Sequence, residues 1–498
     1  MAALRANRLA ALGLVTALQT AWGQSGPATS VEASISGSVN HVETRRSSGA
    51  DTRDLVLQLR PGLVVTSRSG RVRGTLAYSA DLQQHSASAR DFDIAHSLNA
   101  AFTAEAVDNW AFIDATASLA RRAVSAYGVQ VAPSSALGNN NNQDDVANAT
   151  LRPYVRGVLG GSVSYNAALF ASASRTRNSA LGDVNERGGN LALGSLSGGL
   201  FGWGLDASHR RTDYLAGRAT IDERVVASLN FRPDVDWAFS LRGGQESTDV
   251  GSLDKRRYDN WGAGLRWTPS PRTVFSADLD QRYFGRSWAL VLEHRFAQSA
   301  LRLTSSRGAS SSNNSGADGN GITVYQLLFA QLASQLPDPV ARDALVRQML
   351  LQGQIDPSMR VPGGSLGNAV SLQRRTDLGW TYAGGRLTLA LQASSSYTNT
   401  LDTLAPRLGD GPVSQRGLIA SVAWRLTPTA SSNLSLSQLK TANEGTRAGN
   451  DLNSIAIGVG DQIGLRTTAS LSARHSRQSG GPDPYRETAL GAALSHRF

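Results

Sequence analysis

The sequence predicts an all-β fold: a transmembrane, antiparallel, up-and-down β-barrel of about 22 strands, within a range of roughly 16–22, with a short helical insertion in one long loop. Three observations predict this fold. Apolar and polar residues alternate over segments of about ten residues from Val31 onward. Short connections between these segments alternate with long polar ones, and tryptophans gather at one end of the predicted strands.

The N-terminal residues have the pattern of a secretory signal peptide. Arg5 and Arg8 provide a positive start, residues 9–18 are apolar, and small residues precede a cleavage site after Gly23. We therefore expect a signal peptide at 1–23 and a barrel over 24–498, although a short buried helix is the alternative for the first segment. No later apolar run reaches the roughly 20 residues that a membrane-spanning helix needs.

The composition excludes several classes of site. The 498 residues include no cysteine, which excludes disulfides and thiolate metal sites. The formal net charge is +10, and nearly all positive charge is arginine because Lys255 and Lys440 are the only lysines. These charges are spread over the alternating segments, so we expect no nucleic-acid partner. The arginine excess can equally reflect a codon-biased genome.

The alternation of residue types is clear over residues 287–296. Trp288 and Leu290 share one face of the segment, whereas Glu293 and Arg295 share the other. Each such segment requires one apolar and one wet environment. A soluble sandwich supplies the apolar side as a core, and a transmembrane barrel supplies it as lipid around a polar interior.

Loop lengths separate these two alternatives. We expect strands at 31–42, 53–65, 71–83, 91–107, 109–122, 149–160, 163–175, 189–199, 201–214, 220–232, 236–247, 256–267, 272–282, 286–296, 299–307, 366–380, 384–397, 413–425, 429–440, 451–460, 463–475 and 485–498. Connections after even-numbered strands are short, and those after odd-numbered strands are mostly long and polar. Outer-membrane barrels have this arrangement, and an even strand number places both termini on the periplasmic side.

Aromatic residues support the same orientation. Six tryptophans begin or end predicted strands on the short-turn side: Trp110, Trp203, Trp237, Trp267, Trp380 and Trp424. Amphipathic rings favour the membrane interface, so we expect a periplasmic girdle there. On the last strand, Leu490, Leu494 and the C-terminal Phe498 share the outward face. An aromatic final residue on such a strand resembles the signal read by the barrel-assembly machinery.

One segment departs from the strand pattern. Within the long loop 309–365, which we expect to be flexible, residues 322–352 have apolar residues at helical spacing. Asp338 has the position of an N-cap, and Pro339 follows at the first helical position. The insertion could enter the lumen as a plug, cap the mouth or bind a partner, and packing on the surface is the simpler alternative.

Several motifs resemble those of one known group, the outer-membrane β-barrel family associated with PEP-CTERM/exosortase systems. The resemblance is most specific in three neighbouring stretches, 261–273, 282–286 and 292–295. Weaker matches extend it over nearly the whole mature chain, at 54–78, 337–342, 473–477 and 495–498.

The resemblance implies a bacterial outer-membrane location and a role beside exopolysaccharide synthesis and export. The partners that it implies are outer-membrane lipid, the barrel-assembly machinery, an anionic polysaccharide and periplasmic export proteins. It brings no catalytic motif that can be carried over to particular residues. We therefore expect neither catalytic residues nor a cofactor or metal.

The polar faces of the strands are the best candidate for a site. Alternation assigns eight charged candidates to the lumen: Arg60, Arg71, Arg73, Arg282, Glu293, Arg295, Arg466 and Arg474. Their ion pairs could fix the strands, or their arginines could favour anionic solutes, and the structural role is the more common one.

Three functions remain open at this stage. The first is a channel or conduit, most simply for exopolysaccharide. The second is a non-conducting assembly or anchoring component of an envelope export complex. The third is a barrel-type hydrolase, for which no two of the seven histidines have metal-ligand spacing, and His294 lies between residues of the opposite strand face.

Overall fold

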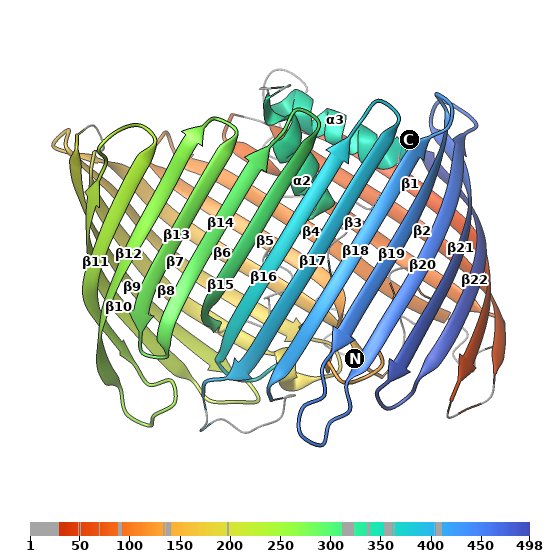
Figure 1. Cartoon of the computed structure of the whole chain (residues 1–498), viewed down its shortest axis with the longest axis horizontal. Coiled ribbons are helices and arrows are strands. Elements are labelled where there is room, and N and C mark those ends of the chain that lie inside the picture. Colours follow the sequence, from red (N-terminus) through yellow and green to blue (C-terminus); the bar gives the residue numbers. More distant parts are fainter. Residues whose placement is uncertain are drawn as a thin grey trace.

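The strands of this chain form one closed sheet. The computed structural model describes residues 29–498 apart from 48, 50, 69, 88–91, 133–134, 136–140, 197–198, 311–322, 335, 337–338, 353–360, 362–363, 403 and 405–410. The predicted signal peptide at 1–23 lies outside the described residues. A single antiparallel sheet of 22 strands surrounds the lumen (Figure 1). The predicted fold class and strand number are thus confirmed.

The strands follow one another around the barrel in chain order. They are β1 Thr29–Arg46, β2 Thr52–Arg68, β3 Val72–His85, β4 Phe92–Val107, β5 Ala111–Ala123, β6 Gln143–Leu159, β7 Val163–Thr176, β8 Val184–Ser195, β9 Phe201–Tyr214, β10 Thr220–Phe231 and β11 Trp237–Thr248. The second half comprises β12 Arg256–Ser270, β13 Thr273–Arg282, β14 Gly285–Arg295, β15 Ser299–Ser310, β16 Ser371–Ala383, β17 Leu387–Thr400, β18 Val413–Arg425, β19 Ala430–Thr441, β20 Asn450–Gln462, β21 Thr467–Gly480 and β22 Tyr485–Arg497.

The first and last strands close the cylinder. β1 pairs with β22 in an antiparallel ladder that runs from Ser34 opposite Arg497 to Arg46 opposite Tyr485. The amide of Phe498 continues this seam by donating to the carbonyl of Ala33 at 3.0 Å. Closure leaves no free sheet edge, which is the condition for placing a sheet in lipid.

The predicted alternation of connections is confirmed. Each even-numbered strand joins the next through a short turn, such as 160–162 or 271–272, whereas odd-numbered strands are followed by longer segments such as 124–142 and 311–370. The short link at 283–284 is the expected exception, and the connections 47–51, 215–219 and 481–484 after β1, β9 and β21 are also only four or five residues long. The C-terminus lies at the short-turn end, which is the upper end in Figure 1.

Some strand bounds differ from the prediction. β6 begins at Gln143, before the predicted start at 149, because Arg121 and Asp145 stand opposite each other and form an ion pair of 3.1 Å between Nε and Oδ1. This pair extends the β5–β6 ladder beyond the apolar alternation. β16 begins at Ser371, after the predicted start at 366, since the preceding residues fold into the lumen as described below.

The wall is apolar on its outer face. On β2, Leu55, Leu57 and Leu59 are 45%, 48% and 45% exposed, whereas Val56 between them is 3% exposed and faces the interior. The same exposure of large apolar side chains recurs around the barrel, and contiguous patches of this kind mark contact with another apolar phase. Within the described part of the chain, no helix has the length and apolarity needed to cross a membrane.

Aromatic rings gather at the short-turn end of neighbouring strands. Phe201 of β9 packs on Phe231 of β10, with ring centroids 5.1 Å apart. Trp237 of β11 stacks on Trp267 of β12 at 5.3 Å. This row lies where the tryptophan positions predict a girdle.

The insertion between β15 and β16 is helical, as predicted. It forms α2 Val324–Gln331, a 3₁₀ turn Leu332–Ser334 and α3 Pro339–Gln352. Thr323 caps α2 in a capping box with Gln326, a local signal that the sequence analysis missed. The predicted N-cap at Asp338 lies outside the described residues.

The exposed apolar band leads to a stability prediction. We expect Leu59→Arg to destabilise the barrel in lipid by about 2–4 kcal/mol, because Leu59 lies near the middle of β2 and faces outward. The matched control is Leu253→Arg in the β11–β12 loop, where Leu253 is 79% exposed. Urea unfolding in liposomes measures the free energy of unfolding of both variants. If both substitutions lowered the free energy of unfolding by the same small amount, a lipid-facing apolar band would be contradicted.

Candidate functional site

The lumen is lined by ion pairs that connect neighbouring strands. The most extensive group involves β11 and β13: Arg242 donates from Nη1 to Asp278 Oδ1 at 2.6 Å and from Nε to Asp280 Oδ1 at 3.0 Å. Further along the same two strands, Arg282 Nε donates to Glu246 Oε2 at 2.9 Å, and the Glu246 side chain is fully buried. The buried carboxylate of Glu246 thus has a guanidinium beside it, which offsets the cost of desolvating both charges.

Glycines on β12 allow Arg242 to reach β13. Gly262 and Gly264 point inward on the strand that lies between the two partners. A Cβ on Gly262 would lie 2.0 Å from Asp280 Oδ1 and 2.7 Å from the carbonyl oxygen of Leu279, so a side chain there collides with the ion pair. A Cβ on Gly264 would lie 2.6 Å from Asp278 Oδ1. The alternating glycines within 261–265 therefore have a structural reason.

Other inward pairs occur around the barrel. They join Arg60 to Asp81 at 3.1 Å, Arg302 to Glu293 at 3.2 Å, and Arg375 to Asp377 at 2.7 Å between their nearest nitrogen and oxygen atoms. Arg474 pairs with the fully buried Glu487. These pairs neutralise arginine charge locally, which favours the structural role that the sequence analysis considered.

The loop between β5 and β6 extends inside the barrel to β20, β21 and β22, which lie several strands away around the wall. Within the β5–β6 connection, Gln130 donates its amide to Gln478 Oε1 of β21 at 2.7 Å. Ser135 Oγ donates to Glu487 Oε2 of β22 at 2.8 Å. Asn450 Nδ2 of β20 donates to the carbonyl of Ala126 at 3.0 Å. We call residues 124–142 the crossing loop.

A second segment lies across the long-loop mouth. Residues 364–370, here called the strap, precede β16. Gly364 donates its amide to Gln415 Oε1 of β18 at 2.7 Å, and Leu366 donates to the carbonyl of Val124 in the crossing loop at 3.2 Å. Asn368 Nδ2 donates to the carbonyl of Ala216, between β9 and β10, at 2.8 Å. The strap thus joins loops from separate parts of the barrel.

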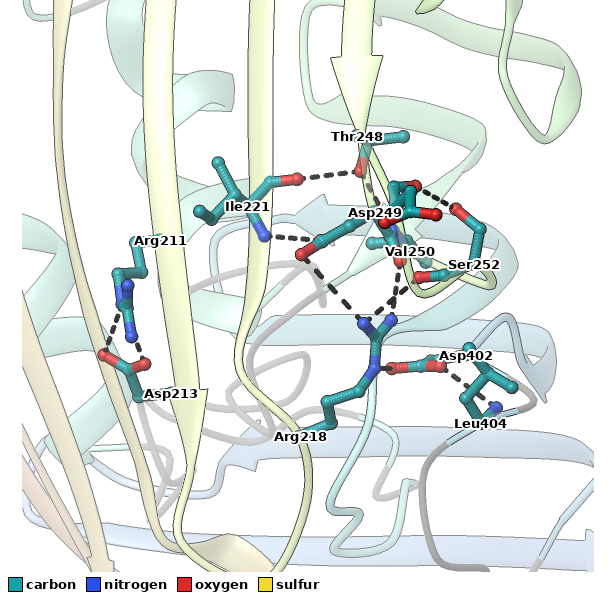
Figure 2. Close-up of polar contacts among 11 residues, drawn as sticks. Arg211, Asp213, Arg218, Ile221, Thr248, Asp249, Val250, Ser252, Asp402 and Leu404 are labelled. Atoms are coloured by element: carbon teal, nitrogen blue, oxygen red, sulfur yellow. Dashed lines mark hydrogen bonds and ion pairs between the residues drawn. The ribbon is translucent and has the colours of Figure 1, made fainter. Parts of the chain in front are cut away.

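Arg218 joins three connections at the long-loop end of the barrel (Figure 2). From the β9–β10 connection it donates Nε to Asp402 Oδ2 at 3.1 Å, Nη1 to the carbonyl of Ser252 at 3.2 Å and Nη2 to the carbonyl of Asp249 at 2.6 Å. The Asp402 side chain is 1% exposed. Asp402 belongs to the β17–β18 connection, so one guanidinium links that connection to those after β9 and β11.

The helical insertion lies at the other end of the lumen. Figure 1 shows α2 and α3 at the short-turn end, although β15 and β16 enter the connection from the long-loop end. Gln331 of α2 donates Nε2 to the carbonyl of Gln298 in the β14–β15 turn at 2.6 Å, and its Oε1 accepts from Thr381 Oγ1 at 2.9 Å. The described helices of the insertion therefore lie within the barrel at its short-turn end and partly fill the lumen there.

The apolar contacts of the insertion are small. Val324, Leu328, Val346 and Leu350 are fully buried and pack with the inward Ala390 and Ala423 of the wall, within a cluster of seven buried residues. Burial, and then the hydrogen bond from its hydroxyl to Asp343 Oδ1, raise the pKa of Tyr325 above its ordinary range. A neutral Tyr325 hydroxyl therefore links α2 to α3 at physiological pH.

The structure places the predicted lumen residues as follows. Arg60, Arg282, Glu293 and Arg474 lie on inward faces and form the ion pairs given above. Arg73 shares the face of Asp81 on β3, and Arg295 that of Glu293 on β14, where its guanidinium donates to the carbonyl of Pro271. Arg71 and Arg466 lie in short turns instead of on strands, because the ladders begin one residue later at β3 and β21. Arg71 pairs there with Asp108 at 3.0 Å.

The three residues of the predicted assembly signal face outward. Leu490, Leu494 and Phe498 are 57%, 52% and 65% exposed on the outer side of the seam. The functional residues that sequence analysis missed are those of the loops, above all Arg218 and Asp402. No local pattern marks this pair, since its members are 184 residues apart.

The contacts of Asp54 bear on the hydrolase alternative. Its Oδ2 lies 2.6 Å from His85 Nδ1, and its Oδ1 accepts the hydroxyl of Ser86 at 3.0 Å. The serine hydroxyl thus donates to the carboxylate and not to the imidazole, unlike the nucleophile of a Ser-His-Asp relay. Among the described residues, no group of three or more His, Asp or Glu side chains is arranged to hold a metal ion.

Comparisons with known proteins give matches of shape only. No protein-family model and no curated protein matches the chain. Among solved structures, the FrpB iron transporter from Neisseria meningitidis has 12% identity and a TM-score of 0.48, with 93% of this chain and 82% of that chain covered. The siderophore receptor PirA from Pseudomonas aeruginosa has 8% identity, a TM-score of 0.42 and coverages of 93% and 80%. A loop-deletion mutant of OmpT, an outer membrane protein of Vibrio cholerae, has 7% identity, a TM-score of 0.30 and coverages of 95% and 100%.

The glycine gap beneath Arg242 can be tested directly. We expect Gly262→Ala to destabilise the barrel by about 1–3 kcal/mol, because the new methyl group displaces Asp280 and presses on the backbone of β13. Gly243→Ala is the control, since a Cβ on Gly243 meets nothing within 4 Å. Urea unfolding in liposomes compares the free energies of unfolding of the two variants. In a protein that already carries Asp280→Ala, Gly262→Ala should lower the free energy of unfolding by less. If the effects of the two substitutions were simply additive, the collision between the new methyl group and Asp280 would be contradicted.

Proposed function

We propose that this chain spans the outer membrane of a Gram-negative bacterium and conducts a solute through its lumen. The observation that carries the proposal is the closed cylinder with apolar side chains outside and ion pairs inside. A sheet with this distribution of side chains fits lipid around it and water within.

Polar contacts hold the interior segments in a way that suits a gate. The crossing loop and the strap bind the wall through hydrogen bonds that involve side chains such as Gln478 and Gln415, and the Arg218–Asp402 contact connects separate loops. The described apolar clusters inside the barrel are small and separate. Segments held in this way can move without unfolding the wall, because the ladders of the wall do not depend on them. Barrels of about 22 strands need such internal segments to limit their lumen.

The proposed solute is an exopolysaccharide on its way to the cell surface, in a PEP-CTERM/exosortase setting. This finer assignment rests on the motif resemblance of the sequence. Inward arginines such as Arg242 and Arg282 suit an anionic polysaccharide, although the acids beside them reduce the net field. The short-turn end, where α2 and α3 lie, would face periplasmic export proteins.

A non-conducting anchor is the second candidate. The observation that favours it is obstruction near both ends of the lumen, by the strap at one end and by the helical insertion at the other. In this case the barrel would hold an export complex in the membrane. Conductance distinguishes the two functions.

We expect Arg218→Gln to raise the mean conductance of the protein in planar bilayers. Loss of the guanidinium leaves the carboxylate of Asp402 buried without its cationic partner, which costs about 3–5 kcal/mol and releases the loops at the mouth. The control is Arg211→Gln, which removes the separate pair with Asp213 seen in Figure 2. Equal conductance of both variants and the unmodified protein would contradict a gate at Arg218.

Removal of the insertion tests conduction itself. We expect a chain lacking 311–363, with β15 and the strap retained, to give larger and longer openings than the full chain. Absence of current from this variant, while it still shows heat-modifiable mobility in gels, would favour the anchor. Deletion of the gene followed by an assay of surface polysaccharide tests the solute. Unchanged polysaccharide would contradict the export assignment and leave the conduit proposal in place.

A further inference from the structure

Three arginines form a row across the seam of the barrel on its outer face. Arg486 of β22 stands directly opposite Arg45 of β1 on one side and Arg477 of β21 on the other. All three side chains are exposed, and they lie near the long-loop ends of their strands. We call these residues the arginine row.

Electrostatic repulsion within the arginine row destabilises this part of the sheet. Like charges directly opposite each other destabilise an antiparallel pair, and here two such pairs share Arg486. Arg45 has one acidic neighbour, Asp51, at 3.9 Å from Nε, and both side chains are about two-thirds exposed. Within the described part of the chain, no acidic side chain lies within ion-pair distance of Arg477 or Arg486.

Nearby acidic groups do not compensate the row. Glu43, two residues from Arg45 on the same outward face, accepts from Arg53 Nε at 3.0 Å. On β21 and β22 the residues next to the arginines on this face are His475 and Thr488, and His475 Nδ1 lies 2.9 Å from Thr488 Oγ1. The positive charge of the row therefore points to an anion outside the chain.

The same arrangement recurs at the long-loop ends of other strands. Cross-strand pairs of cations on the outer face are Arg187 with Arg211, Arg307 with Arg374, and Arg416 with Lys440. Some of these have a local acid, such as Asp213 beside Arg211 at 2.9 Å. At the short-turn end, the outer face carries the aromatic rings of the girdle instead. The outer face thus differs between the long-loop end, which carries cations, and the short-turn end, which carries aromatic rings, as expected if each end contacts a different membrane leaflet.

We infer that the arginine row binds the phosphate groups of lipid headgroups in the leaflet at the long-loop end. The inference rests on the proposed membrane location. Arg486 lies four residues before the outward Leu490, or about 13 Å along β22, which places the row just beyond the apolar band. Arginine presents a planar fork of donors that matches phosphate oxygens, and it can extend along the wall toward the headgroups. Phosphates between the side chains would turn mutual repulsion into attraction.

The test uses the full chain in a neutral maltoside detergent. Phosphatidic acid, phosphatidylcholine and inorganic phosphate are added separately, and native mass spectrometry measures bound lipid. We expect the unmodified protein to bind phosphatidic acid most strongly, and Arg477→Gln with Arg486→Gln to weaken that binding about thirtyfold. The matched control is Arg386→Gln with Arg466→Gln, which removes two exposed arginines from short turns.

Stability provides a second readout. Without phosphatidic acid, the Arg477→Gln, Arg486→Gln variant should have a free energy of unfolding equal to or above that of the unmodified protein, because the repulsion between the arginines is removed. With phosphatidic acid, the free energy of unfolding should rise more for the unmodified protein than for the variant. Equal binding and equal stabilisation of the row variant and the unmodified protein would overturn the inference. So would competition by inorganic phosphate at the same concentration as the lipid. Failure of the membrane location itself would appear differently, as a folded chain that stays in solution without detergent.

Discussion

The constraint on which the rest of the structure depends is the pairing of every backbone ladder in a closed sheet. The seam between β1 and β22 removes the last free edge, and it lets the outer face be apolar without leaving unpaired amides in lipid. Once the outside is apolar, polar side chains must lie inside. They are crowded there, so charges occur as pairs and glycines occur where a pair crosses a strand, as Gly262 does beneath Arg242.

The interior segments are related differently to this wall. The strap, the crossing loop and the helical insertion contact it through hydrogen bonds that involve side chains, and the crossing loop and the insertion add small apolar clusters. The wall provides a stable frame, and the segments inside determine how much of the lumen is open. This separation would allow the interior to change between related proteins while the strands keep their register.

Much of the wall was predictable from the sequence, because its signals are local and repeated. Alternation and connection length gave the strand number and the faces of Arg60, Arg282, Glu293 and Arg474. The ion-pair partners of these residues were harder to predict from the sequence. Arg282, for example, pairs with Glu246 two strands earlier, and this pairing depends on the register of the strands between them. Arg71 and Arg466 were assigned to strands because strand ends are uncertain by a few residues. The Arg218–Asp402 contact depends on loops that meet only after closure.

The path of the β15–β16 connection also limits the order of assembly. Its α3 helix has 14 residues and is about 21 Å long, and it lies at the short-turn end although β15 ends at the long-loop end. Threading such a helix through a finished mouth occupied by the strap and the crossing loop would be slow. While β1 and β22 are still apart, the half-built sheet is open along its side. The insertion can then fold against the concave surface first, and the wall can close around it.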